Sequence, residues 1–304
     1  MSLKLVIGSR GSRLAIEQSN IVKESILNLK PDVDVSIKII KTKGDILLSQ
    51  SVQHLVDKGF FVNEIQRELV NKKIDISVHS LKDLPTKNEK NISINSILKR
   101  EDSRDVFISK DNLNPYQIPD GSVIATSSNR RKYQLLKINP TFKVIEIRGN
   151  VDTRIKKWQT GYCDALVLAY AGIKRLNLSR LISYVFSYDE MLPAAGQGAI
   201  AIETRSDDFS TKKIVKNINC SVTEKCVSVE RGVLNKLGLG CNAPIAVNVN
   251  VIDNIVKLKL MIFSISKMKH ISLNLERDVA EIGLLVDEVL SKLNKMDFKK
   301  ILNE

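Results

Sequence analysis

A cysteine set in a turn is the first residue of this sequence whose surroundings suggest chemistry. Cys241 lies in Gly238-Leu-Gly-Cys-Asn-Ala-Pro244, whose residue types favour tight, exposed backbone. The chain has four cysteines and three histidines without a CxxC pair, so neither a disulfide framework nor a zinc site is indicated. Cys241 is either an inert packed thiol or an accessible nucleophile or attachment point. Cys-His hydrolysis is disfavoured because no histidine stands nearby.

His79, Lys82 and Asp83 form a second candidate group. They stand in Asp75-Ile-Ser-Val-His-Ser-Leu-Lys-Asp-Leu-Pro85, where an apolar, strand-like run ends. A carboxylate beside a lysine is commonly a surface ion pair. At the mouth of a cleft, the same carboxylate would stabilise a developing cation or pass a proton. Metal binding by His79 is disfavoured because partners at metal-ligand spacing are missing.

Hydroxyl residues followed by arginines make a third group, in Thr126-Ser-Ser-Asn-Arg-Arg131 and Arg148-Gly-Asn-Val-Asp-Thr-Arg154. Hydroxyls and free backbone N–H groups at helix starts attract anions, and a guanidinium group can hold a carboxylate through two hydrogen bonds. Phosphate or nucleic acid would be held equally well. Nucleic acid is disfavoured, because aromatic residues make up only 5% of the chain and the arginines occupy separate turns instead of one stripe.

The elements that must position these residues follow from the pattern of apolar residues. Short apolar runs alternate with stretches of helical spacing, which is typical of parallel sheets with both faces covered. Strands are expected at 3–7, 35–40, 74–78 and 123–126, a polar turn at 8–12, and helices at 14–29, at 61–70 and from about 130.

Ligands of such sheets gather at the carboxyl ends of the strands. The polar clusters 8–12, 79–83, 126–131 and 148–154 each follow a strand-like run. Two doubly wound domains facing one cleft would therefore bring the clusters together. After about residue 219 the pattern changes to a helix at 222–237, a glycine-rich turn, alternating segments at 246–251 and 256–262, and a helix at 279–293, which indicates a small α+β domain.

Composition narrows the class of protein. The 304 residues carry 47 Lys and Arg against 34 Asp and Glu, a net charge of +13 that attracts anions such as nucleic acid, a membrane surface or a polycarboxylate. Lysine runs at 41–43, 72–73 and 299–300 are typical of solvated faces. No apolar run approaches the roughly 18 residues of a membrane helix, and residues 1–10 lack the build of a signal peptide, so we expect a cytoplasmic protein.

Taken in order, the motifs resemble the porphobilinogen deaminase (hydroxymethylbilane synthase) family, transferases of porphyrin and heme biosynthesis. The matching segments are Gly8-Ser-Arg-Gly-Ser-Arg-Leu-Ala15, Val78-His-Ser-Leu-Lys-Asp83, the two hydroxyl-arginine segments, Leu192-Pro-Ala-Ala-Gly-Gln-Gly198 and Gly240-Cys-Asn-Ala-Pro-Ile245. Each segment alone is a weak signal, but the ordered combination is specific.

The resemblance implies an α/β fold with two doubly wound, periplasmic-binding-protein-like domains flanking a cleft, and a small α+β C-terminal domain. We expect domain 1 in 1–98 and 199–218, domain 2 in 99–198 and domain 3 in 219–304. Domain 1 would carry Asp83 and a lid loop from 43 to 61, domain 2 the arginine face, and domain 3 Cys241. We expect a monomer with no nucleic-acid or membrane partner, which passes its product to the next enzyme of its pathway.

The resemblance also implies the chemistry. Four porphobilinogen molecules would be condensed head-to-tail with loss of ammonia on a dipyrromethane cofactor, which is held by a thioether to Cys241 and built from the enzyme's own substrate. Asp83 would be the catalytic residue, stabilising charge on pyrrole nitrogens as ammonia leaves and an electrophilic azafulvene forms. Hydrolysis would then release the linear tetrapyrrole.

Each added ring brings an acetate and a propionate, whose charges arginines can neutralise through charge-assisted pairs of roughly 1.5–3 kcal/mol each. Nearby cations would also keep Asp83 deprotonated. The cofactor-binding residues implied are Cys241, Lys82, Asp83, Thr126, Ser127, Ser128, Arg130, Arg131, Arg148 and Gly172. The substrate-binding residues implied are Arg10, Ser12, Gln18, Phe61, Arg148, Arg154, Arg175 and Gln197. Phe61 would pack over the cofactor, the alternative being an ordinary core aromatic.

A binding protein remains the alternative from another class. A two-domain anion-binding protein of periplasmic-receptor architecture would share the arginines at strand ends. Such a protein would need an export signal or a membrane partner, and the sequence displays neither. A nucleic-acid-binding function would rest on net charge alone.

Overall fold

The computed structural model describes residues 3–42, 44, 62–87, 89–240, 243–296 and 298–303. The chain divides into two compact units, Met1–Glu101 with Ala199–Glu224, and Asp102–Gly198 with Lys225–Glu304. Cys241, Phe61 and, apart from Gly44, the lid expected at 43–61 lie outside the described residues. The three-domain boundaries expected from the sequence stay a prediction.

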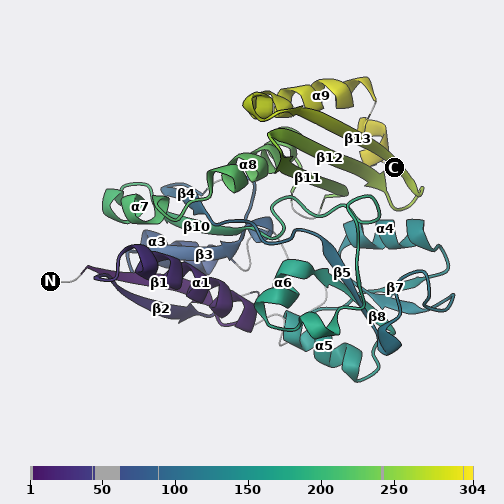
Figure 1. The fold of residues 1–304 in the computed structure, drawn as a ribbon, viewed down its shortest axis with the longest axis horizontal. Helices are drawn as coiled ribbons and strands as arrows, with labels where there is room; N and C mark the ends of the chain where they lie inside the picture. The colour runs from purple at the N-terminus through teal and green to yellow at the C-terminus, as the bar shows by residue number, and fades with distance from the viewer. Residues whose placement is uncertain are drawn as a thin grey trace. The chain divides into compact units, whose positions relative to one another are not determined.

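The first unit is built on a five-stranded sheet of order β2-β1-β3-β10-β4 (Figure 1). Its strands are β1 (Lys4–Arg10), β2 (Asp34–Ile40), β3 (Ile76–Ser80), β4 (Ile92–Ile97) and β10 (Ile200–Arg205). β1 runs parallel to β2 and β3, as predicted, but β10 runs antiparallel to β3 and β4. The sheet is therefore mixed. A buried strand is apolar whichever way it runs, so the local pattern does not reveal the direction of β10.

Helices cover both faces of this sheet. On one face, α1 (Arg13–Leu29) buries Val22 and Ile26 against Leu5 and Ile7 of β1, and α7 (Phe209–Lys216) contributes to the same core. On the other face, α3 (Asn63–Val70) packs its apolar side chains in a second cluster. The 3-10 helix Leu81–Asp83 follows β3 directly. The first unit is thus doubly wound, as the sequence predicted.

The second unit contains a five-stranded sheet of order β7-β6-β8-β5-β9. Its strands are β5 (Asp105–Ser109), β6 (Val123–Ala125), β7 (Lys143–Ile145), β8 (Ala165–Ala169) and β9 (Tyr184–Val185). β6 is parallel to β7 and β8, whereas β5 is antiparallel to β8 and β9. α4 (Asn129–Ile138) packs on one face, and α5 (Val151–Gln159) and α6 (Tyr170–Arg175) pack on the other. Two 3-10 helices, Lys110–Asn112 and Ser179–Leu181, lie in the connections.

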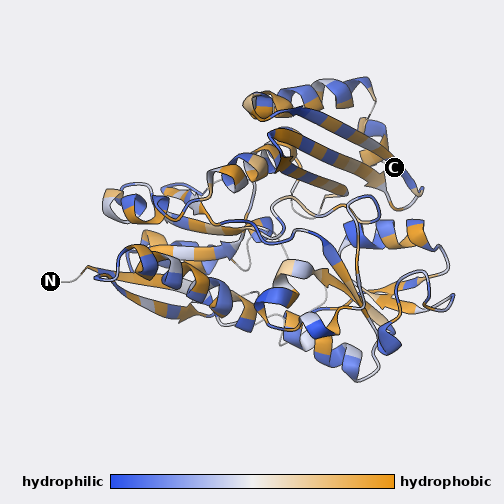
Figure 2. Cartoon of the chain, in the orientation of Figure 1, coloured by the Kyte–Doolittle hydropathy of each residue, from blue (hydrophilic) through white to orange (hydrophobic). Residues whose placement is uncertain are grey.

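A three-stranded antiparallel sheet completes the second unit. It consists of β11 (Ile245–Ile252), β12 (Ile255–Ser264) and β13 (Lys269–Asp278), with hydrophobic and hydrophilic residues alternating along the strands (Figure 2). α8 (Ser221–Lys236), α9 (Leu285–Lys295) and α10 (Phe298–Asn303) share its core. The helix expected at 279–293 is a 3-10 helix, Val279–Leu284, followed by α9.

The predicted fold class is confirmed. Two five-stranded sheets are doubly wound, and the C-terminal part is a small α+β element. The cleft expected between the first two domains stays a prediction.

Candidate functional site

The first candidate segment is the end of β1. The polar turn expected at 8–12 is wrong for its first three residues, because Gly8, Ser9 and Arg10 continue the strand and pair with β2. Position 8 has no room for a side chain, because a Cβ on Gly8 would lie 2.3 Å from Cδ1 of Ile74. Ser12 then caps α1, its side chain accepting a hydrogen bond from the N–H of Ala15.

Several of the predicted residues of the first unit share one edge of its sheet. β1 and β3 are parallel, so Arg10 and Ser80 end at the same side. The Gln18 side chain is buried and donates from Nε2 to Ser80 Oγ at 2.8 Å, which ties α1 to the end of β3. Lys82 and Asp83 follow immediately. Their roles toward a ligand stay predictions.

The backbone at Asp83 is fixed by buried neighbouring residues, while the Asp83 side chain is exposed to solvent. The neighbouring side chains of Leu81 and Leu84 are buried, and the Leu81 N–H donates to the carbonyl of Ala199 at 3.0 Å. Asp83 itself is exposed, and within the described ranges its side chain makes no hydrogen bond or ion pair. The surface ion pair considered for it with Lys82 is therefore not formed.

Behind this turn lies a buried polar cluster. His79 on β3 places Nε2 3.2 Å from Oε2 of Glu203 on β10, within ion-pair distance but without hydrogen-bond geometry. Glu203 accepts from Ser77 Oγ and from Gln66 Nε2, each at 3.0 Å. His79 thus faces the interior of the sheet unit, and not the exposed edge where the sequence grouped it with Asp83.

Acid is expected to weaken this cluster. Burial raises the pKa of Glu203, but its contacts with His79, Gln66 and Ser77 outweigh burial and lower it. A carboxyl group whose pKa is lowered in the folded protein stabilises the fold at pH values above its ordinary pKa of about 4.3. This stabilisation is lost as the pH falls from there through the lowered pKa. Glu203→Gln should therefore show a smaller loss of melting temperature than the wild type as the pH falls from about 5 to about 3.

The matched control for this experiment is Glu89→Gln, which alters an exposed glutamate. Its melting temperature should depend on pH as that of the wild type does. Equal acid sensitivity of the Glu203 variant and the wild type would show that Glu203 does not stabilise the fold through its charge.

In the second unit, the hydroxyls between β6 and α4 shape the turn that carries the arginines. Thr126 Oγ1 accepts from the Ser128 N–H at 3.2 Å, and Ser128 Oγ accepts from the Arg131 N–H as the cap of α4. Ser127 Oγ donates to the carbonyl of Ile147 at 2.5 Å and accepts from its N–H at 3.2 Å. Ser127 therefore joins this turn to the one that precedes α5.

Arg148 stands in that neighbouring turn with most of its donors unengaged. Its side chain is 42% exposed and makes one 3.3 Å contact, with the exposed Glu146. Gly149 has a φ of 118° and a Cβ there would lie 2.7 Å from Thr153 Cγ2, so the turn requires glycine. Arg154 donates from Nε to the Gly149 carbonyl at 2.8 Å.

Three further predicted residues lie in α6 or in the Leu192 to Gly198 segment. Arg175 of α6 donates from Nη2 to the carbonyl of Gly198 at 2.7 Å, and Gly172 is buried within the same helix. Gln197 is 1% exposed and donates from Nε2 to the Ser103 carbonyl at 2.7 Å. Gln197 is therefore bonded inside the protein, a setting that the sequence did not indicate.

Arg130 and Arg131 are buried and share a carboxylate. Asp105, the fully buried first residue of β5, accepts from Arg130 Nη1 at 2.6 Å and from Arg131 Nη2 at 2.7 Å. Burial works to raise the pKa of Asp105, but the two guanidinium groups hold it well below its usual range. Asp105 was not among the residues predicted from the sequence. An acidic residue at the head of the apolar run 106–108 was the available signal.

The three described cysteines are accounted for by packing. Cys163 is buried, and burial together with Asp164 raises its pKa to about 11. Cys226 lies in the core shared by α8 and the three-stranded sheet. Cys220 is partly buried and its sulfur accepts from Thr223 Oγ1 at 3.2 Å. None of the three has the turn setting of Cys241.

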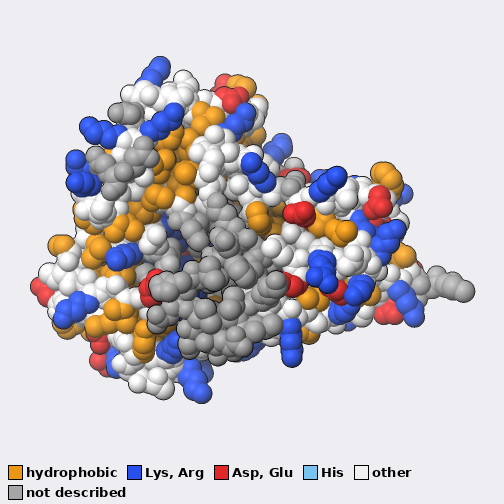
Figure 3. Space-filling view, turned by 180° about the vertical axis from the view of Figure 1, so that it is seen from behind, with side chains coloured by type: hydrophobic (Ala, Val, Ile, Leu, Met, Phe, Trp, Pro, Cys, Tyr) orange, Lys and Arg blue, Asp and Glu red, His pale blue; other side chains and the backbone are white. Residues whose placement is uncertain are grey.

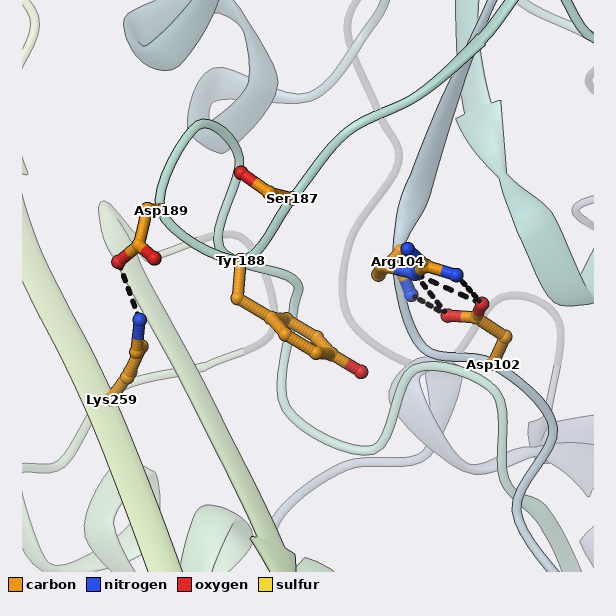
Figure 4. Close-up of a pocket in the computed structure, with 6 residues that line it drawn as sticks. All are labelled: Asp102, Arg104, Ser187, Tyr188, Asp189 and Lys259. Atoms are coloured by element: carbon orange, nitrogen blue, oxygen red, sulfur yellow. Dashed lines mark hydrogen bonds and ion pairs between the residues drawn. The ribbon is translucent and has the colours of Figure 1, made fainter.

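A pocket of about 430 Å³ in the second unit is lined by Asp102, Arg104, Ser187, Tyr188, Asp189 and Lys259 (Figure 4). Its charges are paired, Arg104 with Asp102 and Lys259 with Asp189. Tyr188 reaches Ser103 Oγ at 3.1 Å. None of these residues belongs to the set that the sequence indicated, and the paired charges leave little to attract an ionic ligand.

Positive side chains are spread over the face seen in Figure 3, among acidic and uncharged ones, and do not form one stripe there. This distribution is typical of solvated lysines. No helix in the described ranges has the length and apolar character needed to cross a membrane.

Comparison with known families decides among the remaining classes. The model of the "Porphobilinogen deaminase, dipyromethane cofactor binding domain" matches residues 5–213, and that of the "Porphobilinogen deaminase, C-terminal domain" matches residues 224–293. The chain belongs to the porphobilinogen deaminase family. The binding-protein alternative drew on the architecture and on the arginines at strand ends, and membership of this enzyme family replaces it.

Two relatives named porphobilinogen deaminase align with this chain over more than nine-tenths of their length. A porphobilinogen deaminase of Chlorobium phaeobacteroides is 41% identical over 288 residues, covering 95% of this chain and 91% of the relative. That of Chlorobaculum tepidum is 40% identical over 296 residues, covering 95% of each chain. Among solved structures, the methionine-binding protein MetQ aligns with 12% identity and a TM-score of 0.43, over 71% of this chain and 89% of that one.

Proposed function

We propose that this protein is a hydroxymethylbilane synthase, a transferase that condenses four porphobilinogen molecules head-to-tail, releases ammonia at each step and hydrolyses off the linear tetrapyrrole. The observation that carries the proposal is the match to both domain models of the porphobilinogen deaminase family, which together span most of the chain. The exposed, unengaged Asp83 carboxylate supports it, because the reaction develops positive charge on a pyrrole.

The described residues fit a carboxylated dipyrromethane. Arg130 and Arg131 share one carboxylate, so this buried group carries a net positive charge that an anion would balance. Arg148 adds an exposed guanidinium in the adjoining turn. We propose that Arg130, Arg131 and Arg148 hold the cofactor's carboxylates, with Lys82, Thr126, Ser127, Ser128 and Gly172 around it. When bound, the dipyrromethane supplies the free pyrrole α-carbon at which the chain grows.

We further propose Cys241 as the attachment point, through a thioether. Support comes from the other cysteines, since two are buried and the third is engaged with Thr223. Leu239 and Ala243, which flank Cys241 in the sequence, pack against the core of the three-stranded sheet.

Asp83 acts on the incoming substrate. As the amino group of the aminomethyl substituent of porphobilinogen leaves as ammonia, the methylene carbon stays on the ring and the ring nitrogen becomes positively charged. A carboxylate beside that nitrogen lowers the energy of the cation. Arg10, Ser12, Gln18, Arg154 and Arg175 would bind substrate carboxylates and orient the ring, and Phe61 would cover it. We propose that the enzyme acts as a cytoplasmic monomer whose product passes to the next enzyme of the pathway.

The function is tested by adding porphobilinogen to purified protein and following intact mass and ammonia together. Stepwise covalent mass increments should appear, with one ammonia released for each porphobilinogen consumed and four consumed for each tetrapyrrole released. Consumption of porphobilinogen without covalent increments, or no consumption at all, would refute the proposed function.

A further inference from the structure

Asp105, Arg130, Arg131 and Gln197 form a buried cluster in which the Asp105 carboxylate accepts several hydrogen bonds. Both oxygens of the carboxylate are engaged, Oδ2 by Arg130 and Oδ1 by Arg131 through Nε at 3.1 Å and Nη2 at 2.7 Å. Oδ1 also accepts from Gln197 Nε2 at 2.9 Å. Two cations of α4 and the amide of Gln197 therefore converge on one fully buried carboxylate of β5.

The two arginines are used differently. Arg131 engages all three of its nitrogens, because Nη1 donates to the Val167 carbonyl at 3.0 Å. Arg130 uses only Nη1, which bridges Asp105 and the Leu192 carbonyl. Its Nε and Nη2 make no hydrogen bond within the described part of the chain, and this edge of a guanidinium is suited to hold a carboxylate through two bonds.

Neighbouring cations in a protein interior repel each other more strongly than in water. Without Asp105, the adjacent guanidinium groups of Arg130 and Arg131 would have no shared counter-charge and would turn apart. With it, Arg131 is fixed in place and the open edge of Arg130 keeps one direction. Gln197 fixes Asp105 in turn, since its Nε2 links the carboxylate to the Ser103 carbonyl.

We propose that Asp105 is a positioning residue, which directs the open edge of Arg130 toward the carboxylates of the pyrrole chain, and that Gln197 acts through Asp105 and not by touching substrate. The inference rests on the proposed function, because it names how that function's anion-binding arginines are held. It replaces the substrate-binding role expected for Gln197 from the sequence.

The test compares Gln197→Met with Gln134→Met. Gln134 lies on α4 and bonds to the backbone of Arg130 and Leu192, but not to Asp105. Gln197→Met should raise KM for porphobilinogen about tenfold, the size expected for loss of a hydrogen bond to a charged group. Its kcat per cofactor-loaded molecule should change by less than about twofold, since Asp83 is untouched. Gln134→Met should leave KM unchanged.

A double-mutant cycle separates an indirect role from direct contact. If Gln197 acts through Asp105, adding Gln197→Met to Asp105→Asn should raise KM no further. Independent, multiplying effects of the two substitutions would overturn the proposal, as would an unchanged KM in Gln197→Met alone. If Asp105→Asn does not fold, Asp105→Glu takes its place in the cycle. The intact mass and the turnover of the wild-type protein test the proposed function separately, because neither measurement depends on the Gln197 and Asp105 variants.

Discussion

Asp83→Asn is expected to fold as the wild type does and to lose most of its turnover. The Asp83 side chain is exposed and unengaged in the described ranges, so the amide disturbs no contact of the fold. It removes the negative charge that we propose to stabilise the cationic pyrrole, so we expect kcat to fall by about 10² to 10⁴. Steady-state kinetics with porphobilinogen, beside a melting curve, would measure both properties.

The matched control is Asp32→Asn. Asp32 is also exposed in the first unit, before β2, and it lacks any interaction with the described residues. Its kcat should equal that of the wild type. Near-normal product formation by Asp83→Asn would contradict the catalytic role, and a melting temperature lowered only in that variant would point to a structural role.

The arginine substitutions should separate into two kinds. Arg148→His should leave the melting temperature within about a degree of the wild type, because Arg148 is 42% exposed and makes only one weak contact. It should impair cofactor assembly or elongation by about tenfold or more, through loss of a charge-assisted carboxylate contact. Arg131→His breaks a buried ion pair and should cost about 3–5 kcal/mol of stability in addition.

Arg180→His serves as the control for Arg148, since Arg180 is likewise exposed in the second unit and is not engaged by the described residues. Intact mass gives the loaded fraction of each variant, and the distribution of covalent intermediates gives the step at which elongation stops. If Arg148→His carried the cofactor in full and elongated the pyrrole chain normally, Arg148 would not be a residue of the binding site.

The sequence predicted those parts of the fold that depend on neighbouring residues in the chain. The β1 to α1 unit follows from an apolar run, a capping Ser12 and helical spacing, and the fold has all three. The extension of β1 through Gly8 was missed, because glycine usually ends a strand and the close approach of Ile74 is a tertiary fact. The antiparallel direction of β10 was missed for the same reason.

In the candidate site, too, the sequence predicted features that depend on local patterns and missed contacts between residues that are far apart in the chain. Sequence motifs identified the arginines of α4, but their pairing with Asp105 spans 25 and 26 residues, and that of Gln197 with Asp105 spans 92. No local pattern reports contacts at such separations. The position of Asp83 was easier to predict, because the role proposed for it needs exposure at a strand end and not a distant partner.

The central claim is that the pyrrole chain grows on a dipyrromethane attached to Cys241, and peptide mapping of freshly purified, active protein tests it most directly. We expect the peptide containing Cys241 to carry the mass of two linked pyrroles, and the peptides containing Cys163, Cys220 and Cys226 to have unmodified thiols. Active protein in which Cys241 is unmodified, or in which the pyrroles are attached to another residue, would contradict it.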